Sequence, residues 1–225
     1  RLEPELFERL AHVLLPHDWV NFRLSGEFFC EAGDAAGTGL FDPAARGFRD
    51  AEIAQVDPDL PAMFPRIAAP DAIAAQLSEA AATELGLPAG LPISPGGGDN
   101  MMSAIGAGAI EPGVTVLSLG TSGTAFAWSP EPILDPEELI APFCDSTGGH
   151  LPLLCTMNVT GVTEEVRQLF DGAFSHEQLT ELAAEVEPGC EEVLFLPFLQ
   201  GERVTDLPHA TGTLLGLRPG SLRPG

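Results

Sequence analysis

The chain has 225 residues and a formal net charge of −23, with 33 acidic side chains against 10 basic ones, all of them arginine. This charge argues against binding to nucleic acid or to an anionic membrane, and the absence of lysine excludes a lysine-dependent phosphate loop and a lysine Schiff base. Four cysteines without CxxC spacing indicate neither a zinc site nor a dense disulfide framework. We expect a cytoplasmic protein, because no signal-peptide pattern and no long apolar run is visible.

The first half of the chain is predicted to be mainly helical. Pro16, Gly26 and Gly86 are placed where helices end. In chain order the expected elements are a helix over residues 3–15, a helix over 17–25, a loop with a short strand over 30–42, and a helix over 71–85.

The second half alternates strands and helices. Runs at residues 114–119 and 124–128, joined by a glycine-containing turn, predict a β-hairpin. The change from a helix-rich to a strand-rich pattern near residues 111–113 suggests a domain boundary. The later elements expected are a strand over 151–159, a helix starting at Thr160 or Thr163, a helix capped by Ser175 and Gln178, and a strand over 191–199.

The stretch PGGGDNMM holds three consecutive glycines before Asp99. A glycine run is costly in backbone entropy and marks close approach of something to the backbone. Asp99 is either the N-cap of the following helix or a carboxylate that takes a proton from a substrate hydroxyl, with Asn100 binding a second hydroxyl. The second alternative describes a site for a polyol.

Three other segments leave alternatives open. The GTSGT stretch at residues 120–124 is either an ordinary hairpin turn or a phosphate cradle formed by backbone N–H groups and the hydroxyls of Thr121 and Ser122. It does not match a serine-hydrolase elbow. Asp145 is expected to cap or close a turn, and Glu202 with Arg203 to form an ion pair at a turn.

Taken in order, six segments resemble the FGGY carbohydrate kinases, most closely their ketopentose kinases, over nearly the whole chain. The segments are LLPHDWVNFRLSGE, GDAAGTGLFD, PGGGDNMMSAIGAGAIEPG, VLSLGTSGTAFAW, FCDSTGGHLPLLCTMNVT and LPFLQGER. The resemblance implies an α/β chain of the actin-like ATPase (ribonuclease H-like) fold, with parts of two domains. Residues 1–111 would be the C-terminal part of the sugar-binding domain, and residues 112–225 the N-terminal part of the nucleotide-binding domain.

The resemblance also implies roles for single residues. Asp99 would be the catalytic base, and Asp99 and Asn100 would contact the sugar. Met101 and Met102 would pack the helix behind the base. The phosphate-binding hairpin would consist of Gly120, Thr121, Ser122 and Gly123. The implied reaction is phosphoryl transfer from ATP, with Mg²⁺, to the terminal hydroxyl of D-xylulose, and no metal ligand in the chain is singled out.

The family's first phosphate loop and its adenosine-gripping motif are not found in these residues, so we expect the 225 residues alone to be inactive. Because sheet edges and apolar faces would be left uncovered, self-association of the chain as a homodimer is one expected outcome. Two alternatives stay open: a kinase for another ketose or polyol, such as L-ribulose, and a non-catalytic binding module of the same fold.

Overall fold

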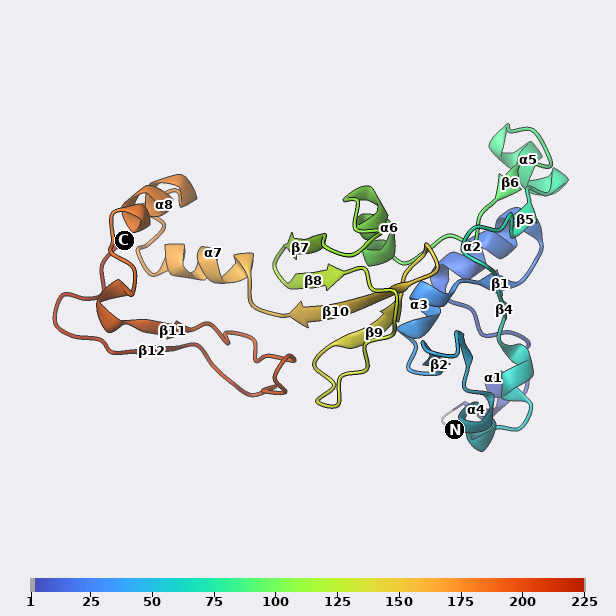
Figure 1. Ribbon diagram of the computed structural model, residues 1–225, viewed down its shortest axis with the longest axis horizontal. Coiled ribbons are helices and arrows are strands. Elements are labelled where there is room, and N and C mark those ends of the chain that lie inside the picture. Colours follow the sequence, from blue (N-terminus) through green and yellow to red (C-terminus); the bar gives the residue numbers. More distant parts are fainter. Residues whose placement is uncertain (1–2, 225) are drawn as a thin grey trace. The chain divides into compact units, whose positions relative to one another are not determined.

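The computed structural model describes residues 3–224 (Figure 1). The chain divides into two compact units, which are described separately below. One unit holds the residues up to Val116 together with Phe126–Leu153, and the other holds Leu117–Ala125 and the residues from Leu154 onward. The division therefore falls within three strands, β7, β8 and β10.

The first unit is a mixed α/β body of short elements. Its helices are α1 (Pro4–Phe7), α2 (Pro16–Ser25), α3 (Ala32–Ala36), α4 (Asp50–Val56), α5 (Glu79–Leu85) and α6 (Asp99–Gly106), with a 3-10 turn at Leu60–Met63. Its short strands pair two by two: β1 (Phe29–Cys30) with β4 (Arg66–Ile67) in parallel, and, antiparallel, β2 (Phe41–Asp42) with β3 (Gly47–Phe48) and β5 (Ala75–Gln76) with β6 (Pro92–Ile93).

The longest strands form one sheet of order β7-β8-β10-β9. They are β7 (Thr115–Leu119), β8 (Gly123–Ala127), β9 (Ala141–Cys144) and β10 (His150–Thr156). The second unit continues with α7 (Thr160–Gln168), α8 (His176–Ala184), a 3-10 turn at Cys190–Glu192, and the antiparallel pair β11 (Leu194–Leu196) and β12 (Thr213–Leu215).

Buried hydrophobic side chains of the described residues all belong to the first unit. One cluster joins α3 to β9 through Ala32, Ala35 and Cys144, with Cys30 and Phe41 beside them. Burial of apolar area is the main favourable term in folding, so the first unit has the better-developed core.

Several predicted helix ends are confirmed. Gly26 ends α2 with a left-handed φ of 82°, and Gly86 ends α5 in the same way with φ 67°. The two-way capping box of Ser175 and Gln178 starts α8. Of the two predicted starts of α7, Thr160 is the correct one.

Two predicted helices are much shorter than expected. The first covers only Pro4–Phe7, and Pro16 begins α2 instead of ending a helix before it. The helix expected over residues 71–85 starts only at Glu79, where the Ser78 side chain accepts a hydrogen bond from the Ala81 N–H. The region expected to be loop over residues 30–42 contains α3 as well as a strand.

Candidate active site

Asp99 is the first residue of α6 and not its N-cap, which is Gly98. Its Oδ1 accepts hydrogen bonds from the backbone N–H of Asn100 at 2.7 Å and from the Asn100 side-chain amide at 3.2 Å. Asp99 is exposed. The helix-cap interpretation of this residue is therefore wrong, and its carboxylate is a solvent-accessible charge in the first turn, where the helix dipole favours it.

The glycine run has a packing reason that the sequence alone does not reveal. Gly96 has φ +85°, a conformation that L side chains rarely adopt. A Cβ on Gly97 would lie 2.4 Å from Met102 Cε and 2.5 Å from Ser146 Oγ, and a Cβ on Gly98 would lie 3.0 Å from Met101 Sδ. The protein's own atoms thus occupy the space next to these backbone positions.

The two methionines after Asp99 differ in their surroundings. Met101 is buried, with 3% of its surface exposed, which agrees with the predicted core role. Met102 is 41% exposed, so the core prediction is wrong for this residue. Its methyl group covers Gly97 instead.

Side chains from α2 and α3 hold the segment before Asp99. The Asn21 amide donates a buried hydrogen bond of 3.0 Å to the carbonyl of Pro95. His17 Nδ1 lies 2.8 Å from Asp34 Oδ2, and Asp34 Oδ1 lies 3.3 Å from the position of a Cβ on Gly98. The hydrogen bond to Asp34 raises the pKa of His17, while burial opposes it.

Asp145 closes a turn, as predicted. Its backbone N–H donates to the Gly149 carbonyl at 3.1 Å, and its carboxylate accepts a hydrogen bond from the Thr147 hydroxyl. Asp145 is only 3% exposed, so it is a structural residue of the first unit.

The GTSGT segment forms the tight turn between β7 and β8. The Gly120 N–H donates to the Ser122 carbonyl at 2.9 Å, so this N–H is not available to a phosphate. The carbonyls of Gly120 and Thr121 accept hydrogen bonds of 3.0 and 3.2 Å from the residues that begin α7. Gly123 is buried, and a Cβ there would lie 2.7 Å from Val159 Cγ2. Thr121 and Ser122 are exposed.

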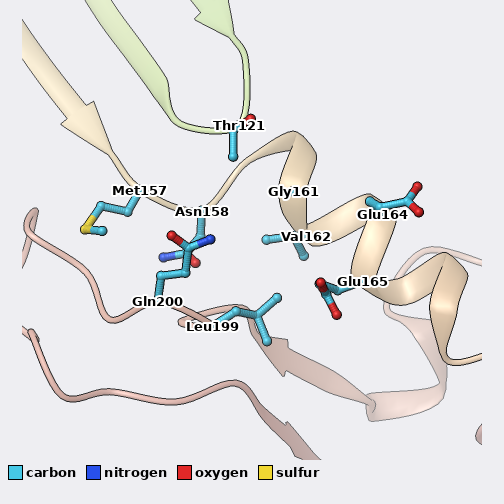
Figure 2. Close-up of a pocket in the computed structure, with 9 residues that line it drawn as sticks. All are labelled: Thr121, Met157, Asn158, Gly161, Val162, Glu164, Glu165, Leu199 and Gln200. Carbon is cyan, nitrogen blue, oxygen red and sulfur yellow. The ribbon is translucent and has the colours of Figure 1, made fainter.

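A cavity of about 490 Å³ lies next to this turn in the second unit. Figure 2 shows the hairpin turn that carries Thr121 beside the first turn of α7, with Met157, Asn158 and Gln200 on one side of the cavity. The cavity is lined by Thr121, Met157, Asn158, Gly161, Val162, Glu164, Glu165, Leu199 and Gln200. Thr121 is therefore the predicted hairpin residue that faces a ligand-sized space.

Glu164, which also lines this cavity, makes hydrogen bonds to side chains that are near it in the sequence. It accepts from the Arg167 guanidinium at 2.6 Å and from the Gln168 amide at 2.7 Å, and it lies 3.1 Å from His176 Nε2. Together these contacts lower the pKa of the Glu164 carboxyl to about 2, and the hydrogen bond from Arg167 contributes most.

The sequence-based prediction for Glu202 is also wrong. It does not pair with the Arg203 guanidinium, but accepts from the Arg203 backbone N–H at 2.8 Å and from donors of residues 156–158. It is 4% exposed. The position of Glu202 between Gly201 and Arg203 in a Gly/Pro-rich frame gave no sign of this burial.

The candidate residues thus fall into two groups. Asp99 and Asn100 belong to the first unit, and the residues Gly120–Gly123 belong to the second. Within residues 3–224, no group of three or more His, Cys, Asp or Glu side chains could hold a metal ion, and no helix is long and apolar enough to cross a membrane.

Residues 1–106 match the FGGY family of carbohydrate kinases, N-terminal domain. The chain is 40% identical over 218 residues to a xylulose kinase of Streptomyces coelicolor, which covers 96% of this chain and 42% of that protein. The chain is thus similar to the FGGY carbohydrate kinases over residues 1–106 and to xylulose kinases over nearly its whole length. A xylulose kinase of Haemophilus influenzae is 37% identical over 216 residues, or 95% of this chain and 43% of that protein.

Solved structures of FGGY kinases have the same fold. The structure of a xylulose kinase from Rhodospirillum rubrum superimposes with a TM-score of 0.88 at 28% identity, covering 97% of this chain and 44% of that one. This agreement confirms the predicted actin-like ATPase fold, of which the chain covers a part. The chain spans less than half the length of the xylulose kinases it matches.

Proposed function

We propose that the protein is an ATP-dependent sugar kinase that converts D-xylulose to D-xylulose 5-phosphate. The observation that carries the proposal is the exposed Asp99 carboxylate at the start of α6, directly after the glycine run, in a chain similar to several xylulose kinases. In the reaction, the terminal hydroxyl oxygen of the sugar forms a bond to the γ-phosphorus as the bond to the leaving ADP oxygen breaks. Asp99 takes the hydroxyl proton.

The hydrogen bonds of Asn100 orient the proposed base. Because Oδ1 of Asp99 accepts both N–H groups of Asn100, we assign the proton transfer to Oδ2. Asn100 would also contact a sugar hydroxyl. A fixed carboxylate next to the reacting oxygen supplies positioning, which is a large part of the rate in phosphoryl transfer.

The nucleotide would bind in the second unit, at the cavity beside the β7–β8 turn. The proposed contacts are made by the hairpin residues Gly120, Thr121, Ser122 and Gly123, of which Thr121 lines the cavity. Because the N–H of Gly120 closes the turn, we assign to Gly120 the shape of the turn and not the donation of a hydrogen bond to phosphate. A volume of about 490 Å³ is in the range of small-molecule sites.

We further propose that a magnesium ion reaches this cavity together with the nucleotide. Thr121, Asn158 and Glu165 offer hydroxyl, amide and carboxylate oxygens, the ligand types that Mg²⁺ accepts alongside substrate phosphates. When bound, Mg²⁺ would neutralise charge on the phosphates. In this strongly acidic chain such neutralisation would also offset repulsion of the nucleotide.

The division into domains remains part of this proposal. We assign residues 1–111 to the sugar-binding domain and 112–225 to the nucleotide-binding domain, in a cytoplasmic enzyme. We further infer that residues 1–225 by themselves give no useful turnover, because the family's first phosphate loop and its adenosine-gripping motif are not found in these residues. Measurable turnover by these residues alone would overturn that inference.

The test is ADP release by the longest natural polypeptide that contains this chain, with Mg-ATP and a panel of acceptors. We expect the highest kcat/KM with D-xylulose. A higher value with L-ribulose or another polyol would keep the chemistry and change the substrate. No ADP release with any acceptor would reject the kinase proposal in favour of a non-catalytic binding module.

A further inference from the structure

The second unit buries the carboxylate of Glu202. Glu202 is 4% exposed, whereas the buried hydrophobic side chains of the described residues lie in the first unit. Burying a charge is costly unless hydrogen bonds satisfy it. A carboxylate in this position therefore calls for an explanation in terms of the groups that it holds.

Donors from two chain segments surround the Glu202 carboxylate. From the end of β10 and the two residues after it, the Thr156 hydroxyl donates at 2.7 Å, the Met157 N–H at 2.9 Å and the Asn158 amide at 3.1 Å. From its own segment, the Arg203 N–H donates at 2.8 Å. Although burial alone raises the pKa of this carboxyl, the hydrogen bonds lower it to about 2, so the group is charged at neutral pH.

The two segments that Glu202 joins are walls of the cavity beside the β7–β8 turn. Met157 and Asn158 line it from one segment, and Leu199 and Gln200 line it from the other. Figure 2 shows Asn158 and Gln200 in the same part of the cavity. A second bond, from the Asn158 amide to the Gly201 carbonyl at 2.7 Å, joins the same two segments.

The segment after β10 in turn holds the hairpin. The Val159 N–H donates to the Thr121 carbonyl at 3.2 Å, and the Thr160 N–H donates to the Gly120 carbonyl at 3.0 Å. Val159 also packs against Gly123, where it lies 2.7 Å from the position of a Cβ. A continuous set of contacts therefore runs from the Glu202 carboxylate through residues 156–160 to the turn.

We propose that Glu202 is a positioning residue for nucleotide binding, which fixes the two walls of the cavity and the β7–β8 turn at the spacing that the phosphates require. The inference rests on the proposed kinase function. Glu202 itself acts through Met157, Asn158 and the turn. Loss of its charge would let the two segments separate and would weaken the binding of Mg-ATP and Mg-ADP.

The variant Glu202→Gln tests this idea with little change in volume. In the wild type, the surrounding donors face carboxylate oxygens. In the variant, some of them would face the N–H groups of the glutamine amide, so at least part of the hydrogen-bond network breaks. The milder variant Thr156→Val keeps the methyl group near Gly123 and removes only one hydroxyl donor. The matched control is Glu181→Gln, an exposed glutamate on α8 in the same unit.

The measurements are the Kd of Mg-ADP by calorimetry and the KM values of ATP and of D-xylulose, made on the longest natural polypeptide that contains this chain. For Glu202→Gln we expect the Kd of Mg-ADP and the KM of ATP to rise about tenfold or more, because small displacements of a binding wall cost this much, while the KM of D-xylulose stays unchanged. Thr156→Val should show a smaller rise in the same two constants, and Glu181→Gln none.

Each result decides one of the two proposals. A purely structural role for Glu202 would lower the active fraction and the Tm without changing the KM of ATP, and an unchanged KM would overturn the inference. If Glu202→Gln does not fold, Thr156→Val decides in the same way.

If the wild type binds Mg-ADP but phosphorylates no sugar, only the kinase proposal fails, and if it binds no Mg-ADP, the positioning inference fails.

Discussion

Gly201 lies at a close backbone approach in the second unit, and its replacement by alanine gives a sharp test of this region. A Cβ at this position would lie 2.5 Å from the Pro208 carbonyl oxygen and 3.0 Å from the Leu207 carbonyl oxygen. Both obstacles are backbone atoms, so no side-chain rotation can relieve the contact. The neighbouring residue Glu202 exchanges two hydrogen bonds of 2.9 Å with Leu207, and these fix the approach.

The expected cost has two parts. Gly201 has φ +70°, and a left-handed conformation costs an alanine about 1–2 kcal/mol. The overlap adds roughly 1–3 kcal/mol, which is typical of overpacking. Gly220 in the same unit has φ +83° with no atom within 4 Å of the Cβ position, so Gly220→Ala carries the first cost alone. The difference between the two variants isolates the overlap.

The free energy of unfolding of both variants should be measured by far-UV circular dichroism in urea. Tryptophan fluorescence is unsuitable because Trp19 and Trp128 belong to the first unit. Hydrogen exchange of peptides containing Glu202 and Leu207 then locates the loss of stability. We expect Gly201→Ala to be less stable than Gly220→Ala by about 1–3 kcal/mol, with faster exchange at these two residues. A difference below about 0.5 kcal/mol would refute the close approach.

A thiol reagent should modify the exposed Cys190 of the native protein well before Cys30, which is 1% exposed and whose pKa is raised by burial, and equal rates without denaturant would contradict this. The hydrogen bond to Asp34 raises the pKa of His17 above 6.5, so its contribution to the free energy of unfolding is full below that pH and is lost as pH rises through the raised value. His17→Gln should remove this loss, and an unchanged pH dependence above pH 6.5 would contradict the account. The pH dependence of the stabilisation by Glu202 has the opposite sign. Because the pKa of Glu202 is lowered from 4.5 to about 2, its stabilisation is present above pH 4.5 and is lost as pH falls towards 2. Urea unfolding of Glu202→Gln should therefore differ from the wild type at neutral pH and approach it near pH 2, and a constant difference would be the contrary result.

Local signals in the sequence predicted several helix ends correctly, although Pro16 begins α2 instead of ending a helix. Gly26 and Gly86 act through their own backbone freedom, and the pair of Ser175 and Gln178 acts through bonds within one turn, so none of them depends on the rest of the fold. The β7–β8 hairpin was predicted for the same reason, since its turn residues determine its geometry.

Longer periodic patterns predicted too much helix. Ile73 and Leu77 continue the helical spacing of α5, but Ile73 is 69% exposed, and residues Ala75–Gln76 pair with β6 instead. Tertiary pairing overrides helical spacing where a neighbouring strand is available to accept hydrogen bonds.

The candidate site shows the same division between local and distant causes. The position of Asp99 at the start of a helix followed from the glycine run before it and the small residues after it. The reason for the glycines did not, because it lies in Met102 and in Ser146, a residue distant in the sequence. The burial of Glu202 depends on Thr156 and its neighbours, about 45 positions earlier in the chain, which no spacing rule connects to it.

The most direct test of the central claim compares the wild type with Asp99→Asn, using the longest natural polypeptide that contains this chain. ADP release is measured with Mg-ATP in the presence and absence of D-xylulose, and D-xylulose binding is measured in parallel. The account predicts sugar-dependent ADP release by the wild type and a loss of roughly 10²–10⁴-fold in Asp99→Asn, with the sugar still bound. Turnover by Asp99→Asn at the wild-type rate would contradict the role of Asp99 as the base.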